Sequence, residues 1–381
     1  MSLGYRPRSS TLRRWRYADY LLFVALLLLL AYGLALVYSS TFPFRDASTA
    51  AFSSYVKRQA IYAVFGLLLM VFVSCLDYRL LHATAYLLYG GTLLLLLIVL
   101  LSPHGQTEYG SQRWINLIVF PLQPSELAKP ALVLALARYF SDHEPQVKAF
   151  HHFVASVFLT VPTVVLVYAQ PDLGTSTTFL VIWFLMALVA GVRLIYLALT
   201  GALAIASVPI VWSLLKDYMR DRITIFLHPE SDPWGQGYNI IQALISIGSG
   251  GMYGRGFLAG TQSQGHFLRV QYSDFIFSVL AEELGFVGAL VLFGLFLVLL
   301  MRIIRAASLA RDGFGRLAAA GIAIMLLFSV SVNVGANLRL MPVTGIPLPF
   351  ISYGGSALIT NLICIGIVQS ILMRRKRFLR N

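Results

Sequence analysis

Long apolar runs separated by short polar segments follow one another along most of the 381-residue chain. A helix of about 20 apolar residues crosses the hydrocarbon core of a bilayer. The expected fold class is therefore all-α: a polytopic membrane protein with about ten transmembrane helices in a single domain over residues 19–373. The predicted spans, of which the fourth is the shortest, are 19–40, 57–76, 80–102, 126–141, 151–169, 174–192, 194–215, 275–301, 317–340 and 353–373.

Residues 216–274 interrupt this pattern with a large polar loop between the seventh and eighth predicted helices. The loop ends at Asp274, directly before an apolar run, so a carboxylate is expected where a polar segment meets the membrane. This junction is the first place where we expect chemistry. Although only 12% of the chain is charged, the loop holds Lys216, Asp217, Arg220, Asp221, Arg222, Glu230, Asp232, Arg255, Arg269 and Asp274.

The formal net charge of +13 would suggest a nucleic-acid partner in a soluble protein. In a membrane protein, basic residues gather instead on the cytoplasmic side. With the N-terminus inside, 18 of the 29 lysines and arginines fall in cytoplasmic segments. This orientation predicts cytoplasmic basic tails at 1–18 and 374–381, an extracytoplasmic loop at 216–274, and no nucleic-acid partner.

Several other classes of protein are not indicated. The two cysteines, Cys75 and Cys364, lie in apolar runs without disulfide or metal-site spacing. No GxxxxGK[ST] motif and no GxGxxG motif after a strand is present, so nucleotide-driven chemistry is not expected. The first apolar run lacks a small-residue cleavage site, which favours a retained helix over a signal peptide.

The loop between the third and fourth predicted helices contains Arg113 and Trp114, and the fourth predicted helix begins with Glu126 and Lys129 in its first turn. A helix starting near Pro124 places Glu126 and Lys129 one turn apart on one face. They could form a mutually satisfied ion pair that fixes a helix end, or line a cavity, because charges inside a membrane often mark a substrate path. Arg113 and Trp114 could equally be interfacial anchors.

Two further outer segments have both a structural and a functional interpretation. Lys57 and Arg58 begin the second predicted helix, where cations suit a phosphate head group but could also snorkel to the interface. The segment 247–256 has five glycines in ten residues, which resembles a phosphate cradle but is more typical of a hinge or a partly re-entrant loop. Asp172 is predicted to cap the following helix.

Carboxylates and prolines mark the remaining candidate segments. Asp274, Ser278 and Glu282 have the spacing of one helix face, with Glu283 pointing elsewhere, although Asp274 would also suit a helix cap. Three prolines and a glycine follow Asn333 within an apolar run and exclude a regular helix there. Irregular backbone at membrane depth is tolerated where it lines a cavity, so this stretch is expected to line the site.

Together these segments resemble the SEDS family (shape, elongation, division, sporulation) of multi-pass peptidoglycan polymerases, over residues 19–373. The form of the segment from Pro342 is more similar to the elongation type, RodA, than to the division type, FtsW. The resemblance is carried by KRQ from Lys57, GSQRWINL from Gly110, QPSELAK from Gln123, QPDLGTS from Gln170, RDRITIFLHPESDPWGQGY from Arg220, IGSGGMYGRG from Ile247, GTQSQ from Gly260, SDFIFSVLAEELGFVG from Ser273 and PVTGIPLPFISYGGS from Pro342.

The resemblance implies a glycosyltransferase of the bacterial inner membrane that polymerises lipid II on the outer face and releases undecaprenyl pyrophosphate. It implies a class B penicillin-binding protein (PBP2-like) and other elongation-complex proteins as partners, in contact with membrane lipids. The aspartate that the family requires falls on Asp274. Substrate-binding positions are expected at Arg58, Arg113, Trp114, Glu126, Lys129, Arg222 and Ser278. Arg269, Val270 and Tyr272 depart from the family pattern just before that aspartate.

These residues suggest a mechanism in which Asp274 takes the proton from the acceptor's sugar 4-hydroxyl as it attacks the anomeric carbon that bears the pyrophosphate. Arg58, Lys129 and Arg222 would stabilise the leaving group. No metal cage is predicted, and a divalent cation (Mg²⁺ or Mn²⁺) on the pyrophosphate stays open. A lipid II flippase and a non-enzymatic activator of a penicillin-binding protein are the alternative functions.

Overall fold

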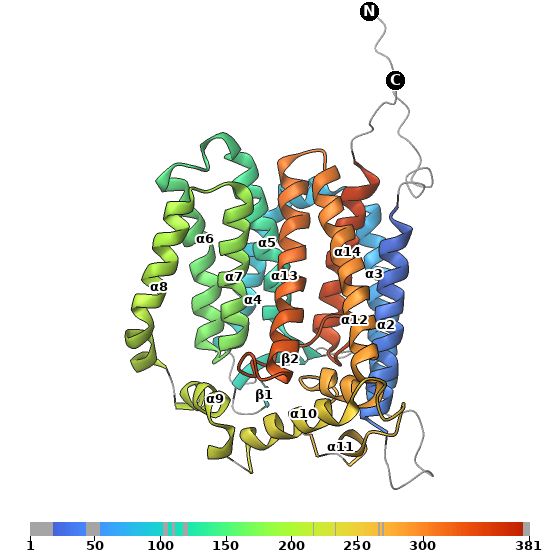
Figure 1. Ribbon diagram of the computed structural model, residues 1–381. Helices are drawn as coiled ribbons and strands as arrows, with labels where there is room; N and C mark the ends of the chain where they lie inside the picture. Colours follow the sequence, from blue (N-terminus) through green and yellow to red (C-terminus); the bar gives the residue numbers. More distant parts are fainter. Residues whose placement is uncertain are drawn as a thin grey trace, which may run out of the picture.

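Ten helices of at least 18 residues run side by side in the described part of the computed structural model (Figure 1). The structure describes residues 18–42, 54–101, 106–108, 111–116, 121–215, 217–232, 234–265, 267–268 and 270–375. Each of the ten predicted spans coincides with one of these helices. They are α2 (Tyr20–Ser40), α3 (Ser54–Cys75), α4 (Tyr78–Leu101), α5 (Pro124–Asp142), α6 (Phe150–Ala169), α7 (Leu173–Ala190), α8 (Leu194–Leu214), α12 (Ile276–Leu309), α13 (Gly313–Asn337) and α14 (Gly355–Met373).

Among the described residues, eight of the ten helices are long and apolar enough to cross a membrane, and α8 contains a further apolar stretch, Leu194–Ile210. Helix α5 carries charged residues in its first and last turns, and it packs against α4, α7, α13 and α14, so that protein rather than lipid surrounds it. A helix buried on all sides is expected in the centre of a bundle. Helix α8 lies at the edge of the bundle with most of its side chains exposed (Figure 1).

Helix α2 begins and α14 ends at the same end of the bundle (Figure 1). The opposite end, called here the α9–α11 end, carries helices α9 (Asp217–Leu227), α10 (Gln236–Gly250) and α11 (Thr261–Gln264), with the 3₁₀ turn η3 (Pro229–Ser231). The predicted large loop is thus mostly helical. The basic tails lie almost wholly outside the described residues, although Arg374 is buried and donates to the Cys75 carbonyl at 2.8 Å.

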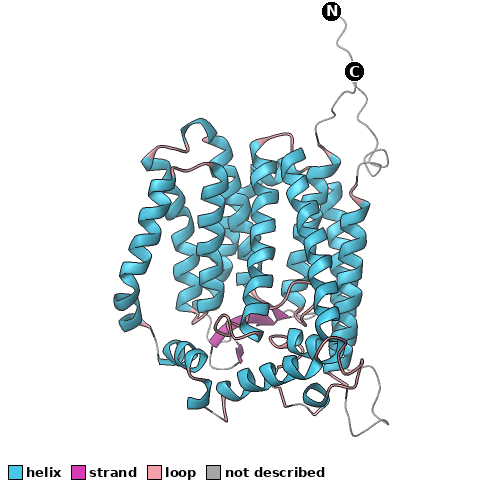
Figure 2. Cartoon of the chain, viewed as in Figure 1, coloured by secondary structure: helices cyan, strands magenta, loops and turns pink. Residues whose placement is uncertain are grey.

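A small antiparallel sheet also lies at the α9–α11 end (Figure 2), an addition to the all-α prediction. Its strands are β1 (Gln106–Glu108), β2 (Ser111–Asn116) and β3 (Pro121–Leu122), in the order β1-β2-β3. Gln106 pairs with Trp114 and Ile115 pairs with Leu122. The short 3₁₀ turn η2 (Glu144–Gln146) belongs to the other end of the bundle.

The glycine-rich segment after α10 packs against a kink in α12. Gly285 has a φ of 64° inside α12, which interrupts the helix. The N–H groups of Arg255 and Gly256 donate to the carbonyls of Glu282 and Glu283, both at 2.9 Å, and so satisfy groups near the kink. Since these N–H groups are already used, the segment is not a phosphate cradle. The positive φ values of Gly251, Gly254 and Gly256 explain why glycine is needed there.

Replacing Gly254 with alanine is expected to lower the thermal unfolding temperature of the purified protein in detergent. A Cβ at this position would lie 2.1 Å from the Glu283 carbonyl oxygen, and Gly254 has a φ of 78°. A non-glycine residue in such a conformation costs about 1–3 kcal/mol before any clash. Gly248→Ala is the matched control, because no atom lies within 4 Å of its added Cβ. Equal unfolding temperatures for the two variants would contradict this packing.

Candidate functional site

Asp274 lies at the α9–α11 end, in the turn that leads into α12. The helix begins at Ile276, with Phe275 in the cap position and no side-chain capping hydrogen bond. The alternative interpretation of Asp274 as a helix cap is therefore wrong. Because Asp274 precedes the helix, it also does not share a helix face with Ser278 and Glu282. Its carboxylate is half-buried and accepts a hydrogen bond from the Ser273 hydroxyl at 3.1 Å.

The end of α13 fixes the backbone of Asp274. The side-chain amides of Asn333 and Asn337 donate to the Asp274 carbonyl at 3.3 and 2.9 Å. Asn333 also donates to the Ile346 carbonyl at 2.9 Å, which ties the proline-rich stretch to the same point. Sequence reasoning used Asn333 only as the start of a motif and missed this role. Two asparagines four residues apart on an apolar helix were the available signal.

The proline-rich stretch holds the turn from the other side. The Ser352 hydroxyl donates to the Ser273 carbonyl at 2.7 Å, and the Tyr353 N–H donates to the Tyr272 carbonyl at 2.9 Å. Gln59 of α3, buried at 2% exposure, donates to the Ser352 carbonyl at 3.1 Å. The irregular backbone after Asn337 thus lies against the Asp274 turn. Helix α13 therefore holds this turn directly, through Asn333 and Asn337, and α3 holds it indirectly, through Ser352.

The backbone of the Asp274 turn is itself strained. Val270 has a φ of 55°, and its carbonyl accepts from the N–H groups of Ser273 and Asp274 at 3.1 and 3.2 Å. A β-branched residue with positive φ is a rare outlier, and such outliers cluster at functional sites. This strain is therefore consistent with a functional role for the turn.

Ser278 was predicted among the substrate-binding residues, and that role stays a prediction. Its side chain is fully buried, and its hydroxyl donates to Asn337 Oδ1 at 2.6 Å. Ser278 therefore supports the asparagine that holds the Asp274 carbonyl. Glu282 is also fully buried and accepts from the N–H groups of Gln262 and Ser263 at 2.7 and 2.9 Å, so it caps the start of α11.

Among the predicted cations, Arg222 of α9 lies near enough to Asp274 for its charge to act on the carboxylate. Burial raises the pKa of the Asp274 carboxyl above its usual value near 3.8, while the Ser273 hydrogen bond and the Arg222 charge oppose the rise. Arg339 holds α9 in place by donating to the Leu227 carbonyl at 2.9 Å. Asp274 is thus a carboxylate in a partly desolvated site with a cation nearby.

Glu126 and Lys129 form an ion pair in the first turn of α5, as one of the two predicted interpretations requires. Lys129 Nζ lies 2.8 Å from Glu126 Oε1, and the residues are 5% and 4% exposed. The helix start is linked to the proline-rich stretch because the Ser356 hydroxyl donates to the Pro121 carbonyl at 2.7 Å and accepts from the Gln123 N–H at 3.0 Å. The pair therefore lies at the α9–α11 end of the bundle.

The other predicted residues are distributed around this end. Arg58 is exposed on α3, and Trp114 is half-buried in β2. Burial raises the pKa of the Tyr353 hydroxyl, and the neighbouring Arg58 opposes the rise, which places the Arg58 guanidinium next to Tyr353. The backbone of Arg113 belongs to β2, but its side chain lies outside the described residues. Asp172 caps α7 by accepting from the Thr175 N–H at 3.1 Å, as predicted.

Among the described residues, no group of three or more His, Cys, Asp or Glu side chains is arranged to hold a metal ion. This observation does not concern a divalent cation bound to the pyrophosphate of a substrate, which stays a prediction.

A family model and similar proteins of known name all assign the chain to the same family. The FtsW/RodA/SpoVE model, described as a cell cycle protein, matches residues 19–377. The chain is 41% identical to the peptidoglycan glycosyltransferase MrdB of Escherichia coli K12, over 84% of this chain and 86% of the relative. It is 37% identical to the stage V sporulation protein E of Bacillus subtilis strain 168, over 93% and 96%.

Solved structures resemble the fold closely. A chain from a peptidoglycan synthase complex that coordinates polymerization and crosslinking has a TM-score of 0.78 and 36% identity, covering 94% of this chain and 99% of that one. The rod shape determining protein RodA of Thermus thermophilus has a TM-score of 0.70 and 32% identity, with coverages of 95% and 99%. These matches confirm the resemblance predicted from the motifs. The chain therefore belongs to the FtsW/RodA/SpoVE family of cell cycle proteins.

Proposed function

We propose that this protein is a peptidoglycan glycosyltransferase that polymerises lipid II at the outer face of the bacterial inner membrane and releases undecaprenyl pyrophosphate. The observation that carries the proposal is Asp274, a carboxylate that caps no helix and is held by two elements beside the Arg222 charge. The names of the relatives support the reaction class. The form of the segment from Pro342 supports a role in cell elongation.

In this mechanism Asp274 acts as the general base. It accepts the proton of the acceptor's sugar 4-hydroxyl while the hydroxyl oxygen attacks the anomeric carbon of the donor. The new C–O bond forms as the bond to the pyrophosphate breaks, with inversion at that carbon. Arg58, Arg222 and Lys129, with Arg113 and Trp114, bind the negatively charged head group, and cations stabilise the charge that develops on the pyrophosphate. Glu126 orients Lys129 through their 2.8 Å contact.

The orientation in the membrane belongs to the same proposal. The α9–α11 end faces the outside, and both termini are cytoplasmic. Two arguments support this: α2 begins and α14 ends at the opposite end of the bundle, and in the sequence this orientation assigns 18 of the 29 lysines and arginines to cytoplasmic segments. A class B penicillin-binding protein, PBP2-like, is the proposed partner, together with other elongation-complex proteins. The similarity to a chain of a peptidoglycan synthase complex supports a partner of this kind.

The test is polymerisation of fluorescently labelled lipid II by the purified protein, with and without its partner, followed on a gel that resolves glycan strands. We expect a ladder of glycan products that requires this chain. Movement of lipid II across a vesicle membrane without any polymer would support the flippase alternative. Polymer formed by the partner alone, and only enhanced by this chain, would support the activator alternative.

The pH dependence of the reaction is expected to report the pKa of Asp274. Only the carboxylate accepts a proton, so kcat/KM rises with pH through the raised pKa of Asp274 and then levels off. Replacing Arg222 with alanine removes a charge that stabilises the carboxylate, so the inflection moves to higher pH. Arg255→Ala removes an exposed arginine from the same end and serves as the control. An inflection that stays in place, or moves to lower pH, in Arg222→Ala would contradict the assignment.

A further inference from the structure

The glycine-rich segment supplies hydrogen-bond partners for the helix groups at the kink in α12. In a regular helix each N–H donates to the carbonyl four residues earlier, and Gly285 breaks this pattern. Two N–H groups after the break and two carbonyls before it bond to the glycine-rich segment instead. The bonds run from the Phe286 and Val287 N–H groups to the Gly251 and Met252 carbonyls, at 2.9 and 3.1 Å, and from the Arg255 and Gly256 N–H groups to the Glu282 and Glu283 carbonyls, both at 2.9 Å.

This pairing matters because an unpaired backbone group is costly wherever water cannot reach it. Irregular backbone is therefore tolerated near the hydrocarbon of a membrane only where protein groups satisfy it. The segment and the kink satisfy each other, so the segment does not need water at this point.

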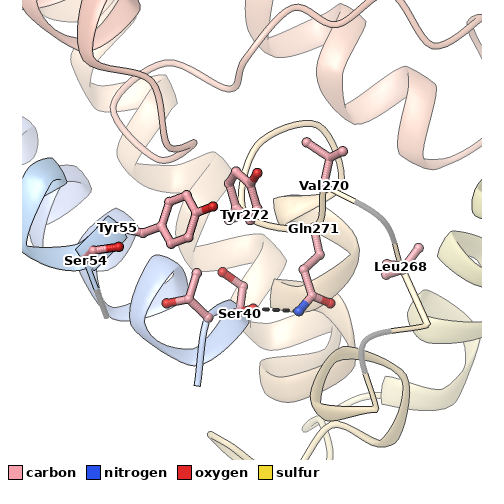
Figure 3. Close-up of a pocket in the computed structure, with 8 residues that line it drawn as sticks. Ser40, Ser54, Tyr55, Leu268, Val270, Gln271 and Tyr272 are labelled. Atoms are coloured by element: carbon pink, nitrogen blue, oxygen red, sulfur yellow. Dashed lines mark hydrogen bonds between the residues drawn. The ribbon is translucent and has the colours of Figure 1, made fainter. Parts of the chain in front are cut away.

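The kink lies level with the end of α2. Helix α2 is apolar enough to cross a membrane and ends at Ser40, which marks the edge of the span. The Ser39 hydroxyl donates to the Glu283 carboxylate, and the Gln264 amide donates to the Ser39 carbonyl at 3.2 Å. The Gln271 amide, in the turn before Asp274, donates to the Ser40 carbonyl at 2.5 Å (Figure 3). The kink and the glycine-rich segment bound to it are therefore at the membrane edge.

Three large apolar side chains of this region point away from the rest of the protein. They are called here the apolar tip and are Met252, Tyr253 and Phe257, which are 59%, 82% and 45% exposed. Beside them Phe286 and Leu290 are each 59% exposed on α12, where a membrane-spanning helix meets lipid. The hydrogen bond from Val287 to Met252 makes the apolar tip continuous with this lipid-facing surface.

Exposed apolar side chains of this kind mark a contact with lipid, a ligand or another protein. Continuity with α12 and the level of the α2 end both favour lipid. Tyrosine is typical of the membrane–water interface, because its ring is apolar and its hydroxyl remains wet. Arg255 is exposed on the same segment, and from this level its long side chain can extend to the water beyond the acyl chains.

We infer that the apolar tip enters the membrane leaflet at the α9–α11 end and contacts the acyl chains of its lipids. In the proposed orientation this is the outer leaflet. The lipid contact holds the glycine-rich segment against the α12 kink and so fixes the end of α10. It requires only that α2 and α12 span a membrane, and it does not depend on glycosyl transfer.

The test measures the surroundings of a nitroxide spin label attached at Met252→Cys, Tyr253→Cys or Phe257→Cys. The full chain is reconstituted in vesicles of phosphatidylethanolamine and phosphatidylglycerol. Oxygen concentrates among acyl chains whereas a nickel chelate stays in water, so power-saturation EPR distinguishes the two surroundings. We expect labels on the apolar tip to be more accessible to oxygen than to the chelate. A Cys75→Ser background removes the partly exposed native cysteine, and Cys364 is buried.

Two labelled variants provide the references. Leu290→Cys on α12 reports lipid, and Glu230→Cys reports water, because the Glu230 side chain is charged and 71% exposed in η3. Thermal unfolding checks that each variant is folded, and the three tip positions test the contact independently. Tip labels that favour the chelate, as Glu230→Cys should, would overturn the inference in favour of a water-exposed loop. Low accessibility to both reagents would also overturn it, since protein would then cover the apolar tip.

Discussion

Asp274→Asn is expected to abolish glycan polymerisation while leaving the protein folded. The amide keeps the shape of the carboxylate but accepts no proton, and loss of general-base assistance lowers kcat by about 10²–10⁴-fold. Burial raises the pKa of Asp274. At pH values above the usual pKa of an aspartate, the charged carboxylate is therefore less favourable in the folded protein than in the unfolded chain. The neutral amide should therefore leave the unfolding temperature at neutral pH unchanged or slightly higher. Strand synthesis on a gel and thermal unfolding measure the two effects.

The control for this substitution is Asp217→Asn, at the start of α9, where the side chain is 97% exposed and remote from the hydrogen bonds that hold the turn. Its polymerisation rate should match that of the wild type. Partner binding by Asp274→Asn, followed by co-purification, should also be unaffected. Full activity in folded Asp274→Asn would remove the general-base role and leave the aspartate as a structural residue of the turn.

Breaking the Glu126–Lys129 pair is expected to give the largest loss of stability. Both side chains are nearly inaccessible, so replacing one leaves the other as an uncompensated buried charge, which costs about 3–5 kcal/mol. We expect Lys129→Met and Glu126→Gln each to lower the free energy of unfolding strongly. The double variant should recover much of that loss, because no buried charge is left unpaired. Denaturation in detergent and a double-mutant cycle give these values.

The same cycle separates the two predicted interpretations of the pair. If Lys129 also binds the head group, the double variant recovers stability but not polymerisation. Recovery of both would make the pair purely structural. Asp217 and Arg220 offer a control pair with the same spacing in a solvent-exposed helix, where Arg220 Nη1 lies 3.7 Å from Asp217 Oδ1. A cycle there should show little or no coupling, since exposed ion pairs contribute little.

The ten helices were predictable because the length and hydropathy of a membrane span are local properties of the sequence. The same is true of the Asp172 cap, whose carboxylate reaches an N–H three residues away. The Glu126–Lys129 pair also follows from local helical spacing. The small sheet and the helices of the 216–274 loop were not expected, since short amphipathic or polar elements there depend on the bundle end on which they pack.

The candidate site depended more on distant contacts. Ser278 has the sequence spacing of a site residue, yet its hydroxyl donates a hydrogen bond to Asn337, which lies 59 residues further along the chain. The sequence of the glycine-rich segment resembles an anion-binding loop. In the structure, however, the N–H groups of Arg255 and Gly256 donate to carbonyls of the kinked helix α12. The rings of Tyr55, Tyr272 and Tyr353 pack together although they come from three separate segments, and no periodicity relates them.

By itself, then, the sequence determined the membrane class, the positions of the ten long helices, the family and the aspartate at the end of the long loop. Only the tertiary structure decided what holds that aspartate and what surrounds it. Gln59 and Ser352 are joined by a hydrogen bond across 293 residues, and Asn337 reaches the Asp274 carbonyl across 63. Local patterns specify where a helix begins and which residues it contains, but the partner of each buried polar group is set by the packing of remote helices.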